Sequence, residues 1–375
     1  MKIAIDAADL CDKRIDGTRI YIKNVLDHLG HLSPADNFFI YSKGRLNPAL
    51  KFKKYSNYTI RCSSAPFFWT QLKFPFELKK DKPDVLWMPL QTVPYLIPSD
   101  LKVVVTIHDL AFKIFPHHFP AKDCFLLNLF TKKAIKQAAK IIAVSKNTKQ
   151  DIIKYYQAPA SKIQVIYHGF NRKIFNPKTA QNPAAIKKIK NKFKIKKDYL
   201  LYVGAIQPRK NLSVLLKAFE TVKENQSGRE LSLVLAGPRA WLNQIVFKQI
   251  QSCRFASDII FTGPFKTREL PGLLGAARAF VFPSLYEGFG IPVLEAMASG
   301  TPVISSDNSS LPEVGGGAPQ YFNAQNSSEL AAIIKNVLDS PGLQKSMRQK
   351  GLEQARKSSW EKCAKLTSQI LTDHK

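Results

Sequence analysis

The sequence predicts two α/β domains of similar size, each built on a parallel β-sheet with helices on both faces. The first observation is length, because 375 residues exceed what one hydrophobic core ordinarily holds. The second is that short apolar runs alternate with helical patterns along the chain. The third is a stretch rich in Asn, Pro, Gln and Lys, near residues 170–197, that separates two sets of such runs.

The apolar runs are nearly continuous rather than alternating, which is typical of strands buried on both faces. The strands expected in the first set are Ile3–Asp6, Phe38–Tyr41, Val85–Met88, Val103–Ile107, Ile141–Val144 and Val165–Tyr167. Those expected in the second set are Tyr199–Val203, Leu231–Ala236, Ile259–Thr262, Ala279–Phe282 and Val303–Ser305. Helical patterns lie between them at Thr131–Ala139, Lys146–Tyr156, Leu212–Lys223 and Leu330–Asp339.

These elements predict the domain boundaries. Residues 1–170 form an N-terminal Rossmann-like domain, and 198–355 form a C-terminal one. Residues 171–197 are expected to be a linker followed by a solvated basic helix, and 356–375 are expected to end the chain in a helix. A cleft between two such domains is a preferred place for a ligand.

The chain is strongly basic, with 56 Lys and Arg against 28 Asp and Glu and a net charge of +28. Such a balance favours a polyanionic partner, although many of the lysines could simply solubilise an ordinary surface. The five cysteines have neither disulfide-framework nor metal-ligand spacing, and we expect them to be reduced thiols. We find no signal peptide and no apolar stretch of the roughly 18 residues that a membrane span needs, so we expect a cytoplasmic protein, in solution or peripheral on a membrane.

The most informative segment is residues 284–300, SLYEGFGIPVLEAMASG. A glycine-bearing loop, residues 288–290, follows a strand, and Pro292 then opens a short helix that Gly300 is placed to close. Backbone N–H groups and the positive end of the helix dipole suit a diphosphate at this point. Glu287 and Glu295 flank this anion site, and their natural partners are the hydroxyls of sugar and ribose rings.

A second segment, residues 203–211 (VGAIQPRKN), ends a strand in a turn at Gly204. Asn211 is expected to cap the next helix. Arg209 and Lys210 lie at the carboxyl end of the strand, where open α/β sheets bind ligands and where two cations could neutralise a leaving diphosphate. His108 follows a buried strand, and Gly17 lies in the turn after the first strand. The absence of G-x-G-x-x-G disfavours a dinucleotide-dependent dehydrogenase.

Together these segments resemble glycosyltransferase family 4, the retaining group with the GT-B architecture. The resemblance runs through the chain at TIHDLAF (106–112), AVSKNTKQDI (143–152), VIYHGFN (165–171), YVGAIQPRKNL (202–212), FTGPF (261–265), FVFPSLYEGFGIPVLEAMASGTPVIS (280–305) and LPEVGGGA (311–318). It implies that the N-terminal domain serves the acceptor, that the C-terminal domain binds a nucleotide-sugar, and that the last helix crosses back to the N-terminal domain.

The resemblance also implies residue roles. Arg209 and Lys210 would bind the donor diphosphate, and Glu287 the hydroxyls of the transferred sugar. Glu295 would bind the donor ribose, and His108 would help to stabilise the reacting centre. Gly17 would contact the phosphates, and the backbone of Phe289, Gly290 and Ile291 would hold the sugar and its phosphate. Gly263, Pro264 and Phe265 would lie beside the base. Gly204 and Leu294 would complete the donor site. Many members have a glycine doublet in the first loop, where this chain has Asp16 before a single Gly17.

The implied reaction is a front-side displacement with retention, in which cations and the helix N-terminus stabilise the departing diphosphate. It needs no protein nucleophile, no metal and no cofactor. The form of the signature is most like bacterial mannosyltransferases, so GDP-mannose is the expected donor and a glycan or lipid-linked glycan in surface polysaccharide synthesis the expected acceptor. UDP-sugar donors, a sugar-nucleotide epimerase and a non-catalytic glycan- or polyanion-binding protein are the alternatives.

The aromatic and basic segment of residues 65–80, with Lys51–Tyr55 nearby, suits an anionic membrane surface, although its aromatic residues could equally belong to the core. No specific nucleic-acid partner is expected, because no nucleic-acid-binding motif accompanies the scattered lysines.

Overall fold

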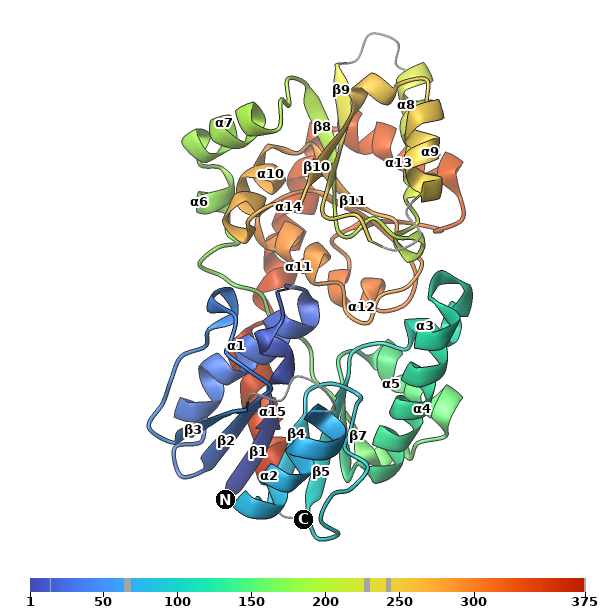
Figure 1. The fold of residues 1–375 in the computed structure, drawn as a ribbon. Coiled ribbons are helices and arrows are strands. Elements are labelled where there is room, and N and C mark those ends of the chain that lie inside the picture. Colours follow the sequence, from blue (N-terminus) through green and yellow to red (C-terminus); the bar gives the residue numbers. More distant parts are fainter. Residues whose placement is uncertain (14, 64–68, 226–229, 241–243, 374–375) are drawn as a thin grey trace. The chain divides into compact units, whose positions relative to one another are not determined.

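The computed structural model describes residues 1–13, 15–63, 69–225, 230–240 and 244–373, and its contacts divide the chain into two compact units (Figure 1). The first unit comprises Met1–Pro116, Pro120–Gly169 and Ser359–Lys375. The second comprises His117–Phe119 and Phe170–Ser358. No helix in the described part of the chain is long and apolar enough to cross a membrane.

The first unit is built on a parallel sheet of seven strands in the order β3-β2-β1-β4-β5-β6-β7. The strands are β1 (Lys2–Asp6), β2 (Asn37–Ser42), β3 (Tyr58–Cys62), β4 (Val85–Met88), β5 (Lys102–Ile107), β6 (Lys140–Ala143) and β7 (Ile163–Val165). The helices are α1 (Gly17–Leu32), α2 (Phe74–Asp81), α3 (Ala111–Ile114), α4 (Ala121–Gln137), α5 (Lys146–Tyr156) and α15 (Trp360–Thr372). Short helical turns are η1 (Ala8–Cys11), η2 (Pro48–Leu50), η3 (Trp69–Lys73), η4 (Pro116–His118) and η5 (Ala160–Lys162).

The second unit repeats the plan with six parallel strands in the order β10-β9-β8-β11-β12-β13. The strands are β8 (Asp198–Val203), β9 (Leu231–Ala236), β10 (Ile259–Gly263), β11 (Ala279–Phe282), β12 (Val303–Ser306) and β13 (Gln320–Phe322). The helices are α6 (Pro177–Ala180), α7 (Pro183–Lys192), α8 (Leu212–Asn225), α9 (Gln244–Ser252), α10 (Leu270–Ala276), α11 (Ile291–Ala298), α12 (Leu311–Gly315), α13 (Ser327–Asp339) and α14 (Pro341–Arg356). Short turns are η6 (Pro208–Lys210), η7 (Ala256–Asp258) and η8 (Thr267–Glu269).

Both sheets reverse their strand order once, and this fixes where a ligand can bind. In the first sheet the chain moves outward from β1 to β3 and then restarts on the other side at β4. In the second it moves from β8 to β10 and restarts at β11. The loops after the two strands at such a point leave in opposite directions and open a crevice at the carboxyl edge of the sheet.

The predicted buried strands are confirmed, with differences at the edges of the sheets. β3 and β13 were missed because both are edge strands, where polar and half-exposed residues weaken the apolar signal. The strand expected at Val165–Tyr167 is shifted, since β7 ends at Val165. The expected helix at Thr131–Ala139 corresponds to the second half of α4, which begins ten residues earlier, at Ala121, and ends at Gln137. Residues 65–68 of the aromatic and basic segment lie outside the described residues.

The stretch for which the sequence predicts a linker, residues 171–197, lies in the second unit. It supplies α6 and α7, which pack on α10. A Cβ on Gly275 of α10 would lie 1.9 Å from the carbonyl oxygen of Ala180, so the α6–α10 contact requires a glycine. Ile189 is the buried side chain of the otherwise basic α7.

The last helix, α15, belongs to the first unit, where it packs against α1. Its first residue, Trp360, is 4% exposed, and its indole lies 5.4 Å from the ring of His168. A Cβ on Gly169 would lie 2.0 Å from the backbone nitrogen of Trp360, so the contact needs glycine there. Ser359 caps the helix by accepting a hydrogen bond from the Lys362 N–H.

Candidate active site

The strands β8 and β11 are neighbours at the point where the second sheet reverses its order, and the loops after them carry the predicted cations and Glu287. The turn η6 after β8 carries Arg209 and Lys210. The loop 283–290 follows β11 and leads into α11. The two loops are tied together because the Leu285 N–H donates to the Arg209 carbonyl at 2.9 Å.

Glu287 is the centre of a buried charge cluster. One of its carboxylate oxygens lies 2.5 Å from the Lys210 ammonium, and the other lies 3.2 Å from the Arg209 guanidinium. Both Lys210 and Glu287 are at most 9% exposed. Burial alone would raise the pKa of Glu287, but the charges of Lys210 and Arg209 outweigh it and lower the pKa to about 2. The cluster is therefore ionised at neutral pH and has one net positive charge.

Hydroxyl groups hold this cluster and its loop in place. The Ser284 hydroxyl donates to the Glu287 carboxylate at 2.5 Å, and the Glu287 N–H donates to the Ser309 hydroxyl at 3.0 Å. The Ser310 hydroxyl donates to the carbonyls of Glu287 and Phe289, both at 2.9 Å. A carboxylate held by so many partners has a fixed position before any ligand arrives, which is the preorganisation that a binding site needs.

Helix α11 begins at the end of this loop. Its N-cap, Gly290, has φ of 101°, a left-handed conformation that favours glycine. Pro292 lies in the first turn, where its missing N–H costs nothing, and Gly300 follows the helix with φ of 73°. The predicted start and end of this helix are confirmed. Phe289 and Gly290 are buried and Ile291 is half-buried at its N-terminus, while Leu294 is buried one turn later.

Glu295, the second predicted carboxylate of the site, lies in α11. It is half-buried, and in the described part of the chain its carboxylate makes no hydrogen bond or ion pair. Burial raises its pKa to about 8. A partly buried carboxyl group that pairs with none of the described residues is suited to accept hydrogen bonds from a ligand.

The remaining predicted residues of this unit lie at two other strand ends. Gly204 follows β8 and donates its N–H to Ala236 at 2.9 Å, which joins the ends of β8 and β9. Gly263 ends β10 with φ of 66°, and Pro264 and Phe265 follow it, exposed and half-buried respectively. Asn211 directly precedes α8, but its side-chain amide donates to the carbonyls of Pro283 and Ala324, at 3.1 and 2.7 Å. It thereby joins the two loops rather than serving as a simple helix cap.

In the first unit, His108 follows β5 and belongs to a cluster of stacked rings. Its Nε2 lies 2.9 Å from the Pro89 carbonyl, which can only accept, so this nitrogen carries the proton. Its ring is edge-on to Tyr21 at 5.0 Å and to His168 at 5.5 Å, and those two rings stack at 4.8 Å. Burial lowers the pKa of His108, which keeps the imidazole neutral, although hydrogen bonding to Pro89 opposes the shift.

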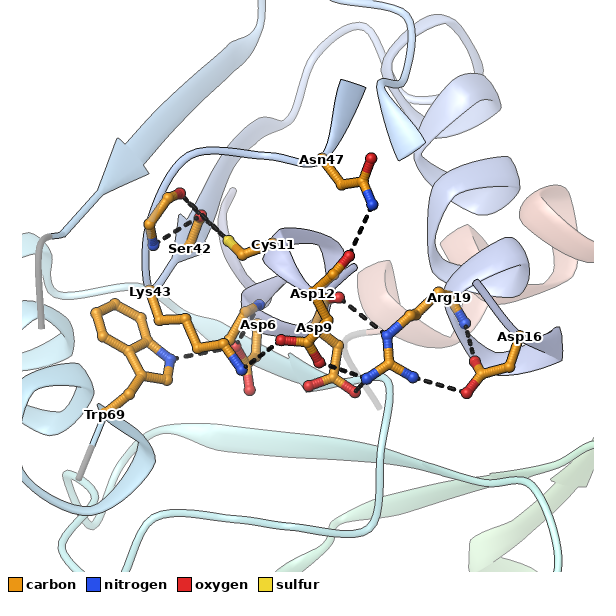
Figure 2. Close-up of polar contacts among 12 residues, drawn as sticks. Asp6, Asp9, Cys11, Asp12, Asp16, Arg19, Ser42, Lys43, Asn47 and Trp69 are labelled. Carbon is orange, nitrogen blue, oxygen red and sulfur yellow. Dashed lines mark hydrogen bonds and ion pairs between the residues drawn. The ribbon is translucent and has the colours of Figure 1, made fainter. Parts of the chain in front are cut away.

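Gly17 is the first residue of α1, and Asp16 caps that helix by accepting from the Arg19 N–H at 3.2 Å. Figure 2 shows the Arg19 guanidinium between the carboxylates of Asp9, Asp12 and Asp16. Its Nη1 lies 2.7 Å from Asp16, and its Nε donates to the Asp9 carbonyl at 3.2 Å. The acidic residue that replaces a glycine in this loop is therefore paired with an arginine of the same helix.

Comparisons with known proteins show which family this chain belongs to. The profile of Glycosyl transferases group 1 matches residues 185–354, and that of Glycosyltransferase Family 4 matches residues 39–173. The chain is 30% identical over 283 residues to the O-antigen chain mannosyltransferase B of Escherichia coli, which covers 75% of this chain and 72% of that protein. The chain belongs to glycosyltransferase family 4.

Other relatives of this glycosyltransferase support the assignment. The O-antigen chain mannosyltransferase RfbU of Salmonella typhimurium is 30% identical over 250 residues, 67% of this chain and 65% of that protein. The Escherichia coli serotype-specific mannosyltransferase WbdA is 26% identical over 287 residues, 76% of this chain, but the match spans only 34% of WbdA.

Solved structures show that the fold of the glycosyltransferase is GT-B. Anabaena HepE, in complex with UDP and glucose, superposes with a TM-score of 0.76 at 16% identity over the full length of both chains. WaaG, a glycosyltransferase involved in lipopolysaccharide biosynthesis, superposes with a TM-score of 0.73 at 15% identity over 99% of both.

Sequence reasoning missed several residues that hold the site of the glycosyltransferase. Ser284, Ser309 and Ser310 orient the Glu287 loop, and Tyr21 and His168 surround His108. Ser309 and Ser310 carried a weak signal in the density of serines at positions 305–310 (SSDNSS), whereas nothing in the sequence marks Tyr21 as a neighbour of His108.

Proposed function

We propose that this glycosyltransferase moves a mannosyl residue from GDP-mannose onto a growing glycan, free or lipid-linked, in the synthesis of a surface polysaccharide. The observation that carries the proposal is the buried Arg209–Lys210–Glu287 cluster at the reversal point of the second sheet, beside the N-terminus of α11. The choice of mannose is supported by the names of the relatives, which are O-antigen mannosyltransferases.

The cluster suggests how the donor would be held. In the free protein Glu287 neutralises one of the two cations, so the site is stable without a ligand. When a diphosphate arrives, Arg209 and Lys210 would turn toward its oxygens, and Glu287 would accept hydrogen bonds from hydroxyls of the sugar. Glu295 would accept from the ribose hydroxyls.

The chemistry would be a displacement on one face of the sugar. The bond between the anomeric carbon and the diphosphate oxygen breaks, that oxygen takes the proton of the acceptor hydroxyl, and the acceptor oxygen bonds to the anomeric carbon with retention. Arg209, Lys210 and the α11 N–H groups would stabilise the charge that develops on the diphosphate, so neither a metal nor another cofactor would be needed. A neutral His108 would offer its Nδ1 lone pair to a hydroxyl of a substrate.

Two further parts of the proposal concern place and partners. The acceptor would be presented at the inner face of the cell membrane, so the protein would act in the cytoplasm and on the surface of an anionic bilayer. Specific binding of nucleic acid is not part of the proposal, because the predicted site residues suit a nucleotide-sugar and its acceptor.

The first experiment is a thermal-shift screen with GDP, UDP, ADP and their sugars, with and without a chelator. A nucleotide that binds only the folded protein raises the melting temperature. We expect GDP and GDP-mannose to raise the melting temperature by the same amount with chelator as without it. If UDP-sugars alone raise the melting temperature, the donor is a UDP-sugar and not GDP-mannose. A shift in melting temperature that the chelator abolishes would contradict the metal-free mechanism.

Turnover then separates the enzyme from its alternatives. Lys210→Ala and Glu287→Ala should each lower transfer by about 100-fold or more, because each removes a group that stabilises the transition state. Lys217→Ala, on the exposed side of α8, is the matched control and should leave transfer unchanged. Normal transfer by both site variants would refute the site. Sugar release or isomerisation without any acceptor would favour an epimerase. Donor binding without turnover would favour a glycan-binding protein.

A further inference from the structure

We propose that Arg239 recognises the base of the donor nucleotide and selects guanine, by donating to the O6 and N7 atoms on one edge of that base. Arg239 belongs to the second unit and lies in the loop after β9, three residues beyond Ala236. The inference rests on the proposed function, because it names the side chain that would make this protein prefer GDP to UDP.

The loop that carries Arg239 is held against the loop that carries the two cations of the site. Ile206 and Arg239 pair in an isolated parallel bridge, and the Ala240 N–H donates to the Ile206 carbonyl at 3.1 Å. A Cβ on Gly237 would lie 2.0 Å from the Gly204 carbonyl oxygen, so the approach of the two loops requires glycine there. Since η6 begins two residues after Ile206, Arg239 lies beside the turn that would bind the diphosphate.

Two phenylalanine rings support the Arg239 guanidinium. Its central carbon lies 3.9 Å from the centre of the Phe247 ring in α9 and 5.5 Å from the centre of the Phe261 ring in β10. The two rings meet edge to face, with their centres 5.3 Å apart. A guanidinium against an aromatic face keeps its N–H donors at its own edge, and the contact restricts the directions in which they point.

The donors of Arg239 are available to a ligand. The side chain is exposed, and none of the residues that the structure describes forms an ion pair or hydrogen bond with its guanidinium. The phenylalanine contacts therefore fix the position of a cation whose hydrogen-bonding capacity the described chain leaves unused. Such a group is suited to pair with acceptors on a ligand.

The space beside Arg239 can accept a flat base. The strand order β10-β9-β8 puts the Arg239 loop between η6 and the end of β10. At that end, a Cβ on Gly263 would meet no atom within 4 Å, so the backbone of Gly263 adjoins open space. The ends of three neighbouring strands span about 10 Å, which a nucleoside diphosphate can bridge. A nucleotide with its diphosphate at η6 and its base toward β10 would bring the edge of the base to Arg239.

The chemistry of a guanidinium favours guanine among the common bases. Its fork donates two parallel hydrogen bonds to two adjacent acceptors, and guanine offers such a pair in O6 and N7. Adenine has the N6 amine, a donor, next to N7, and uracil has a C–H group next to O4, so neither base can accept both bonds. A bidentate pair of this kind favours the correct base by about ten-fold or more.

The test is calorimetric titration of the full-length protein with GDP, inosine diphosphate, 7-deaza-GDP and UDP. Inosine diphosphate retains both O6 and N7, whereas 7-deaza-GDP has a C–H group in place of N7. We expect the wild type to bind GDP more tightly than 7-deaza-GDP by about five-fold or more, because one hydrogen bond to a charged donor is lost.

Two variants of Arg239 separate its fork from its charge. Arg239→Met keeps an apolar chain against Phe247 but has no donors, so it should bind GDP and inosine diphosphate about ten-fold more weakly and UDP less than about two-fold more weakly. It should also bind GDP and 7-deaza-GDP equally. Arg239→Lys keeps the charge without the fork and should lose most of the preference for GDP over UDP.

The matched control is Arg254, another exposed arginine of the second unit. Its guanidinium carbon lies 5.7 Å from the centre of the Phe255 ring, but it precedes β10 and so lies at the opposite edge of the sheet. Arg254→Met should bind all four nucleotides as the wild type does. Melting temperatures of the free variants verify that each is folded.

Three results would overturn the proposal. Equal weakening of GDP and UDP by Arg239→Met would assign Arg239 to the diphosphate or ribose that the two nucleotides share. A preference for GDP that survives in Arg239→Met would assign base recognition to other residues. Both of these results leave GDP-mannose as the donor, because the wild-type preference is measured separately. Tighter binding of UDP than of GDP by the wild type would instead reject the proposed donor, and the guanine contact with it.

Discussion

At the scale of single residues, the two glutamates of α11 and its preceding loop have opposite charge states, because only Glu287 lies beside cations. Glu287 is paired with two cations, and its pKa is lowered to about 2 despite burial. Glu295 has no such partner among the described residues, and burial raises its pKa to about 8. At pH 7 one is therefore an anion that fixes Lys210 and Arg209, and the other is largely a neutral acid.

The shift at Glu287 predicts a dependence of stability on pH. The pKa is lower in the folded than in the unfolded chain, where it is 4.5, so this group stabilises the fold above about pH 4.5 and loses that contribution as pH falls toward 2. The shift corresponds to about 3 kcal/mol. Denaturant unfolding of wild type and Glu287→Gln should therefore give a stability difference that shrinks from pH 5 to pH 2. A difference that stays constant over this range would show that the ion pairs do not stabilise the fold.

The shift at Glu295 predicts proton release on donor binding. Ribose hydroxyls donate to an ionised carboxylate, so the donor should bind the ionised form and release a proton below about pH 8. Calorimetric titration with GDP-mannose near pH 7, in buffers of different ionisation enthalpy, measures that proton. Glu295→Gln should release none, and Glu353→Gln, an exposed residue of α14, should behave as wild type. Equal release by wild type and Glu295→Gln would remove Glu295 from the ribose site.

At the scale of elements, the loop between β11 and α11 depends on one backbone conformation. Gly290 has φ of 101°, and a Cβ there would lie 2.8 Å from Cδ2 of Leu311. Helix α11 starts at this position because Gly290 has no side chain and can adopt this conformation. The backbone at Gly290 sets the direction of the N–H groups in the first turn of α11.

Gly290→Ala should therefore destabilise the protein by about 2 kcal/mol and weaken donor binding, because both the backbone and Leu311 must move. Thermal unfolding and the donor thermal shift measure the two effects. Gly317→Ala is the matched control, since a Cβ at Gly317 would meet no atom within 4 Å. If Gly290→Ala binds the donor as tightly as Gly317→Ala does, the α11 N-terminus does not hold the diphosphate.

At the scale of the whole molecule, the chain completes its first unit with its last helix. Trp360 lies 6.3 Å from Tyr21 and 5.4 Å from His168, and Ser368 of α15 bonds to Ser33 at the end of α1. Lys102 and Lys140, at the starts of β5 and β6, both contact Asp373 after the helix. The aromatic cluster around His108 therefore depends on residues more than 180 positions away in the sequence.

Trp360→Ala should destabilise the first unit by about 3–5 kcal/mol, since it removes a large buried side chain. Scanning calorimetry should show that the first unit unfolds at a lowered temperature. The second unit should unfold near the wild-type temperature, and the donor should still raise that second transition temperature. Gln369→Ala, on the exposed face of the same helix, should leave the profile unchanged. A single transition lowered as a whole would mean that the two units unfold together.

The sequence by itself determined the two parallel α/β units, the start and end of α11 and the loops that carry Arg209, Lys210 and Glu287. It could do so because buried strands and glycine or proline turns depend on local residue types. Only the tertiary structure decided that Glu287 pairs with both cations, that Asn211 joins two loops, and that Tyr21, His108, His168 and Trp360 share one cluster. Those contacts join residues far apart in the chain, and their charges and orientations follow from burial, which local sequence does not specify.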